Sequence, residues 1–120
     1  MEYLEIVLKI VVGLSILNVW LLRGKKSSPF RGGDAKSLKE EFAVYGLPSW
    51  VMFAVGTIKV ALSLLLLISI YYPSLEMIAA LGLAFMMLGA VSMHVKVKDS
   101  FKQTYPALLF LALSLVIYFI

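Results

Sequence analysis

Four long apolar stretches dominate the chain, and they predict its elements. The stretches cover about residues 3–22, 49–72, 74–95 and 104–120. An α-helix needs roughly 20 apolar residues to cross the hydrocarbon core of a bilayer, and each stretch is close to that length. The pattern therefore predicts an all-α integral membrane four-helix bundle, with residues 1–120 forming a single membrane domain.

The connection between the first two stretches contains a further element. Residues 24–33 combine glycine, serine and proline in the way typical of a loop. Within residues 34–46, Leu38, Phe42 and Tyr45 recur at helical spacing, while charged residues fall on the other side. These positions predict a short amphipathic cytoplasmic helix between spans one and two.

Two roles stay open for this helix. Asp34 is placed to cap its start, and Gly46 is placed to end it in the left-handed conformation. Such a helix can be an interfacial anchor that lies on the membrane surface. The alternative is a lid over an opening between the spans, with Glu41 or Tyr45 turned inward.

The basic residues outside the spans predict the orientation of the bundle. They lie in the connection after the first span and in that before the fourth: Arg23, Lys25, Lys26, Arg31, Lys36 and Lys39, then Lys96, Lys98 and Lys102. These two connections share one face of the membrane, and the opposite face has no Lys or Arg outside a span. The positive-inside rule then predicts a multi-pass membrane protein with both termini outside and the basic loops cytoplasmic. We expect the membrane to be the bacterial inner membrane.

Lys59 is the deepest ionisable residue in the spans. An ionisable side chain at the bilayer centre costs about 2.5 to 3.5 kcal/mol, so each one is a candidate functional residue. Lys59 follows Pro48 by eleven residues, which is about 16 Å along a helix and near the midplane of the membrane. We therefore expect Lys59 to face the bundle interior, a water-filled cavity or a neutralising partner.

Four further candidate residues lie within the apolar stretches. Glu5 and Lys9 are one helical turn apart in an order that favours an ion pair. Asn18 and His94 lie near the cytoplasmic ends of their spans, where a hydrogen bond between spans would also explain them. Together with Lys59, these residues are the candidate ligand-binding set.

Composition narrows the chemistry. The chain is 62% hydrophobic, only 15% charged, and has no cysteine and one histidine, which excludes thiol chemistry and cysteine-ligated metals. No catalytic set is recognisable, so we expect a non-catalytic protein without a metal or another cofactor. Nucleic-acid binding is disfavoured because the basic residues have a simpler use beside the membrane.

Small residues predict how the spans pack. Small side chains allow close approach of helices in a membrane, and they concentrate in the third span: Ala79, Ala80, Gly82, Gly89 and Ala90. The third span is therefore expected at the centre of the bundle. After its first turn the fourth span is almost entirely apolar, with Ser114 in its middle, and it is expected to face lipid or another copy of the chain.

Several short motifs carry a resemblance. The chain has LPSW at residues 47–50, VGTIK at 55–59 and LGAVSMH at 88–94. Their order and spacing resemble the DoxX-like family of small four-span membrane proteins. The resemblance implies a four-helix membrane bundle, in a family whose members include subunits associated with quinol-oxidising or sulfur-oxidising complexes. The resemblance departs at Lys59, where many members of the family carry glutamate after the glycine of the second span.

Three functions remain open from sequence. The first is a non-catalytic accessory or assembly subunit, acting in the lipid bilayer on a membrane protein partner or as a homo-oligomer. The second is a binding or transport module whose intramembrane cavity takes a small anionic or quinone-like ligand. The third is a redox subunit that lends a quinol site to a partner holding the metal.

Overall fold

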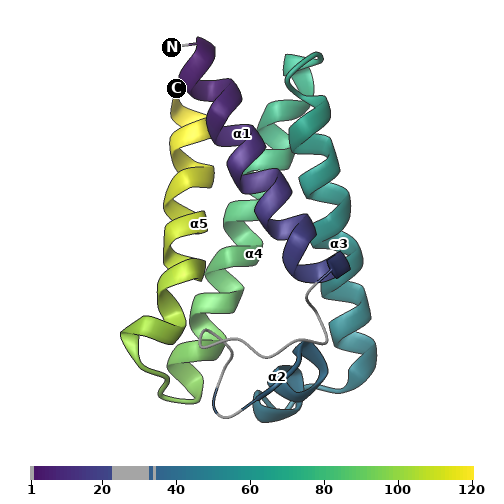
Figure 1. Ribbon diagram of the computed structural model, residues 1–120, viewed down its shortest axis with the longest axis vertical. Helices are drawn as coiled ribbons and strands as arrows, with labels where there is room; N and C mark the ends of the chain where they lie inside the picture. The colour runs from purple at the N-terminus through teal and green to yellow at the C-terminus, as the bar shows by residue number, and fades with distance from the viewer. Residues whose placement is uncertain (1, 23–32, 34) are drawn as a thin grey trace.

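The regular elements of the described chain are all helices. The computed structural model describes residues 2–22, 33 and 35–120 (Figure 1). Its elements in chain order are α1 (Glu2–Leu17), a π-helical turn η1 (Asn18–Leu22), α2 (Leu38–Val44), α3 (Ser49–Ile68), a 3-10 turn η2 (Pro73–Leu75), α4 (Glu76–Lys96) and α5 (Phe101–Phe119). The predicted all-α fold is confirmed.

Four of these segments are long and apolar enough to cross a membrane. They are Tyr3–Leu22, Ser49–Ile68, Pro73–Lys96 and Phe101–Phe119. They form a bundle with principal dimensions of 40, 26 and 20 Å, so its long axis spans a hydrocarbon core of about 30 Å. The predicted four-helix membrane bundle is confirmed.

The two ends of the bundle differ. Both termini and the turn between α3 and α4 lie at one end, whereas α2 and the turn between α4 and α5 lie at the other (Figure 1). We call the second end the α2 end. The basic residues described there are Lys36, Lys39, Lys96, Lys98 and Lys102. Arg23, Lys25, Lys26 and Arg31 lie outside the described residues.

The α4 helix is the most buried of the four spans, and each span packs mainly against two of the others. Helix α4 packs most extensively against α5 and also against α3, while α1 packs against α3. The core is a cluster of buried apolar residues from all four spans: Val12, Ile16, Leu66, Ala79, Ala80, Leu83, Met87 and Ile117. At Gly82, an added Cβ would lie 2.8 Å from a methyl carbon of Leu62, so glycine is what lets α3 and α4 approach here.

Helix α5 begins earlier than its apolar stretch. Ser100 and Gln103 form a capping box, in which each side chain hydrogen-bonds to the backbone of the other. This cap satisfies free backbone N–H groups and starts the helix at Phe101. Pro106 therefore lies within the helix rather than in its first turn.

Helix α2 is short and is capped by Ser37. The Ser37 hydroxyl accepts a hydrogen bond from the backbone N–H of Glu40 at 3.2 Å. Asp34, the cap expected from sequence, lies outside the described residues. Gly46 follows the helix with φ +78°, the left-handed conformation expected of it. Leu38 and Phe42 are the buried residues of the helix.

Candidate functional site

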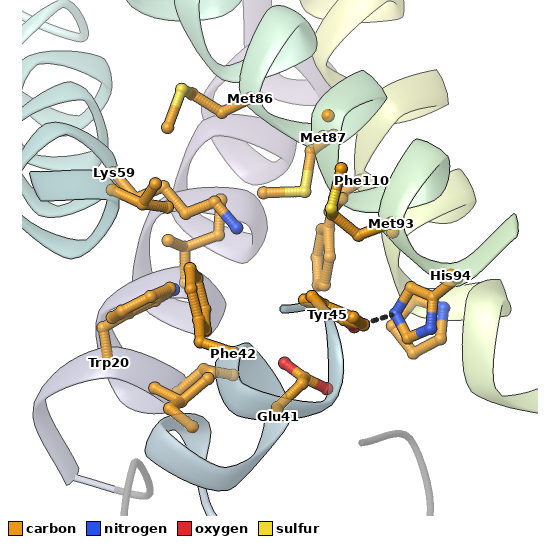
Figure 2. Close-up of a pocket in the computed structure, with 18 of the residues that line it drawn as sticks. Trp20, Glu41, Phe42, Tyr45, Lys59, Met86, Met87, Met93, His94 and Phe110 are labelled. Atoms are coloured by element: carbon orange, nitrogen blue, oxygen red, sulfur yellow. Dashed lines mark hydrogen bonds between the residues drawn. The ribbon is translucent and has the colours of Figure 1, made fainter. Parts of the chain in front are cut away.

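A cavity of about 410 Å³ occupies the half of the bundle nearest α2 (Figure 2). Residues of all four spans and of α2 line it. Its lining is mainly apolar and rich in aromatic and methionine side chains: Trp20, Phe42, Phe85, Phe110, Met86, Met87 and Met93. The polar side chains in the wall are those of Glu41, Tyr45, Lys59, His94 and Gln103.

Lys59 extends from α3 into this cavity. Its side chain points toward the cavity centre (Figure 2), and the residue is only 9% exposed. Its Nζ lies 5.3 Å from the ring centroid of Trp20, within the range of a cation–π interaction. Glu41 of α2 supplies an opposite charge that acts on it. Within the described chain, the ammonium donates no hydrogen bond to a protein group.

The ring of Trp20 lies beside Lys59 because a glycine of α3 leaves room for it. It belongs to η1, the π-helical turn that continues α1, and its ring lies over Gly56 of α3. A Cβ at Gly56 would lie 2.7 Å from two ring carbons of Trp20, so no larger residue fits without displacing the ring. Phe42 packs edge-on against Trp20 with 6.0 Å between the centroids.

A chain of hydrogen bonds connects α2 with the turn after α4. His94 Nδ1 lies 2.7 Å from Asp99 Oδ2, and His94 Nε2 lies 3.4 Å from the Tyr45 hydroxyl oxygen. A carboxylate only accepts, so His94 donates its Nδ1 proton to Asp99, while Nε2 shares a hydrogen bond with the Tyr45 hydroxyl. The other oxygen of Asp99 accepts the backbone N–H of Gly33 at 2.8 Å.

The same contacts fix α2 across the end of the cavity. The Lys96 ammonium donates to the Tyr45 carbonyl at 2.9 Å, so α4 holds both the backbone and the hydroxyl of this residue. Tyr45 is 4% exposed and Phe42 is 8% exposed. Both rings close the α2 end, while the Glu41 carboxylate lies beside the cavity (Figure 2).

Comparison with known proteins assigns the family. The family model described as "DoxX-like family" matches residues 31–117, which is more than half of the chain. The chain belongs to the DoxX-like family. The resemblance inferred from the short motifs is thus confirmed, and the matched segment includes α2 and the three spans after it. No curated protein and no solved structure matches the chain.

In this DoxX-like chain, Lys9 and Glu5 lie at the end opposite the cavity. The Lys9 ammonium is 3.2 Å from Glu76 Oε1 and 3.8 Å from Glu5 Oε1, and it donates to the Ser69 carbonyl at 3.3 Å. Lys9 is 4% exposed. The cluster joins α1, the end of α3 and the start of α4, so its immediate effect is to hold three spans together.

The structure therefore divides the five candidate residues. Lys59 and His94 line the cavity, whereas Lys9 and Glu5 form the ion cluster. Asn18 belongs to η1 and is not among the lining residues. Glu41 and Tyr45, proposed for the inner face of the short helix, do line the cavity.

Sequence reasoning missed Trp20, Phe42, Asp99 and Gln103 as parts of this site. Asp99 follows His94 by five residues across a turn in which Lys98 has φ 58°, and no pattern in the sequence predicts that turn. Trp20 carried a usable signal, because an aromatic residue near the end of a span can face inward as well as toward the interface. Within the part of the chain that the structure describes, no group of three or more metal-ligating side chains comes together.

Proposed function

We propose that this DoxX-like protein is a membrane binding module that holds a small, neutral, quinone-like molecule in the cavity beside Lys59. One observation carries the proposal: a buried ammonium points into a cavity and donates no hydrogen bond to the described protein. A buried charge without hydrogen-bond partners is costly. A carbonyl oxygen of a bound ligand would satisfy it through a charge-assisted hydrogen bond.

The lining supports a neutral ring compound over a small anion. The cavity volume of about 410 Å³ falls in the range of small-molecule sites, about 300 to 1,000 Å³. The Glu41 carboxylate also lines the cavity, and its negative charge would repel an anion in the same space. Trp20, Phe42 and Phe110 offer aromatic surfaces to a planar ligand.

The packing at the other end of the bundle supports binding rather than transport. Val12, Leu66 and Leu83 are fully buried in the core, which fills the space between the cavity and the Lys9 cluster with apolar side chains. A polar molecule would need these helices to separate before it could pass. The proposal therefore describes a site with its occupant held in one half of the membrane.

The binding experiment uses Trp20 as the reporter. Trp50, 70% exposed, is replaced by Phe so that Trp20 alone fluoresces, and the detergent-solubilised protein is titrated with a short-chain water-soluble benzoquinone. We expect saturable quenching, and Lys59→Leu should weaken binding about tenfold or more, the equivalent of one charge-assisted hydrogen bond.

The matched control is Lys102→Leu, which removes an exposed lysine outside the cavity lining and should leave the titration unchanged. Circular dichroism and thermal unfolding establish that each variant is folded. A folded Lys59→Leu protein with the same titration curve as the parent would refute the proposal.

An accessory or assembly role is the second candidate. It is supported by how little of the described chain lies outside the spans, namely α2 and short connections, so that a function through helix contacts with a membrane partner or a second copy suits this protein. Cross-linking in native membranes tests it. A partner that is captured equally by the parent protein and by Lys59→Leu would favour this role over ligand binding.

We also propose that the α2 end faces the cytoplasm and that both termini lie outside. The support is the asymmetry of charge. The described lysines of the α2 end are exposed, whereas Lys9, at the other end, is buried in its ion cluster. The positive-inside rule assigns the basic end to the cytoplasm.

A further inference from the structure

The wall of the cavity is open at one side, between α3 and α4. These antiparallel helices touch where Leu62 packs on Gly82. One turn closer to the α2 end, Lys59 of α3 and Phe85 of α4 lie at the same level. About one further turn along, Val55 and Gly89 lie at the same level. Lys59, Phe85, Val55 and Gly89 all line the cavity. On the α2 side of Leu62, the two helices therefore flank an open space instead of each other.

The exposure of the α4 residues indicates that this space reaches the outside of the bundle. Phe85 is 74% exposed although it lines the cavity. Gly89 is exposed too, and a Cβ added there would meet no atom within 4 Å. By contrast, Ala107 of α5 and Ile16 of α1 line the cavity as buried residues. The most exposed part of the lining is thus the α4 edge of the α3–α4 gap.

The routes into the cavity from the two ends of the bundle are blocked. At the α2 end, Tyr45 is held through His94 and Lys96. At the opposite end the fully buried core intervenes, with Leu66 and Leu83 at 0% exposure. Because the gap lies within two membrane-spanning helices, lipid chains rather than water surround it.

We infer that the cavity takes its ligand sideways from the bilayer, and that the ligand is a lipid-soluble molecule with a single hydrocarbon tail. Its polar head lies beside the Lys59 ammonium, and its tail leaves through the gap past Val55 and Phe85. The apolar rim suits a hydrocarbon chain, while the Lys59 ammonium lies on the α3–α4 side of the lining as a partner for a polar head. This inference rests on the proposed binding function and adds its route and its ligand class.

The test measures contact between a lipid tail and Trp20, which lines the cavity. The Trp50→Phe protein is reconstituted in nanodiscs of unlabelled phospholipid, and a fatty-acid methyl ester brominated on its chain is added in steps. Bromine quenches tryptophan on contact, so a bound tail gives quenching that saturates. We expect Gly89→Phe, which fills the gap, to weaken this saturable quenching at least tenfold, whereas Phe85→Ala keeps or strengthens it.

The matched control is Ala112→Phe, which adds the same side chain at an exposed position of α5 outside the lining and should quench like the parent. Equal quenching in Gly89→Phe and in this control would overturn the inference. So would saturation by a brominated two-chain phospholipid at the same mole fraction, because the occupant would then be bulk lipid.

Failure here is distinguishable from failure of the binding proposal. The benzoquinone titration depends on Lys59, whereas the tail measurement depends on Gly89. If the first dependence holds and the second is absent, the cavity binds a ligand but not through this gap.

Discussion

His94 Nδ1 lies 2.7 Å from Asp99 Oδ2, and this hydrogen bond closes the turn that follows α4. Lys98 makes the turn possible by taking φ 58°. With its Nδ1 proton directed to Asp99, His94 points Nε2 at the Tyr45 hydroxyl, with which it shares a hydrogen bond. A carboxylate outside the spans thereby orients a ring that holds α2 against the bundle.

Asp99→Ala should loosen α2. The substitution removes the acceptor of the part-buried His94 Nδ1–H and that of the exposed Gly33 N–H. A buried donor left unpaired costs about 1 to 3 kcal/mol. Hydrogen exchange of the amides in Leu38–Val44 should accelerate about fivefold or more, while exchange in α3 stays the same. Lys102→Ala serves as the control, and unchanged α2 exchange in Asp99→Ala would show that this hydrogen bond does not hold the helix.

Gly56→Ala should destabilise the protein, whereas Gly89→Ala should not. The new methyl at Gly56 would lie 2.7 Å from Trp20 ring atoms, but at Gly89 it would meet nothing within 4 Å. Overpacking of this kind costs about 1 to 3 kcal/mol. Thermal unfolding in one detergent compares the two variants, and equal midpoints would contradict the described packing of Trp20.

Lys9→Met should cost more stability than Lys59→Leu. Removing Lys9 leaves the carboxylates of Glu5 and Glu76 close together without their shared cation. Breaking a fully buried pair costs about 3 to 5 kcal/mol. These carboxylates are 27% and 22% exposed, so we expect about 2 kcal/mol. Adding Glu5→Gln and Glu76→Gln to Lys9→Met should restore most of the loss. If the triple variant is no more stable than Lys9→Met alone, the ion cluster is not the cause.

Cysteine labelling tests the orientation. The chain has no cysteine, so a single introduced thiol reports its own side of the membrane. Ser74→Cys lies in the turn between α3 and α4, and Lys102→Cys lies at the α2 end. In intact cells, a membrane-impermeant maleimide should label Ser74→Cys only, and permeabilised cells should also label Lys102→Cys. The reverse pattern would invert the proposed topology.

Sequence patterns predicted the spans because membrane insertion depends on long apolar runs, which are a local property. The same reasoning identified Lys59, since a charge in mid-span has to face inward. It could not place Lys9 relative to Lys59, because that depends on how far α1 and α3 overlap along the bundle axis. Lys9 meets the Ser69 carbonyl at the far end of α3. A cavity facing Lys59 was one hypothesis from sequence, but its shape and its lining could not be predicted, because they depend on how α2, α3 and α4 pack against one another.

The central claim is that the cavity around Lys59 holds a small lipid-soluble molecule, and extraction from native membranes tests it most directly. Purified protein is extracted with organic solvent, and the extract is analysed by mass spectrometry. We predict one such molecule, retained near one per chain in the parent and in the Lys102→Leu control, and depleted at least tenfold in Lys59→Leu. No retained molecule in the parent, or equal retention in folded Lys59→Leu, would contradict the claim.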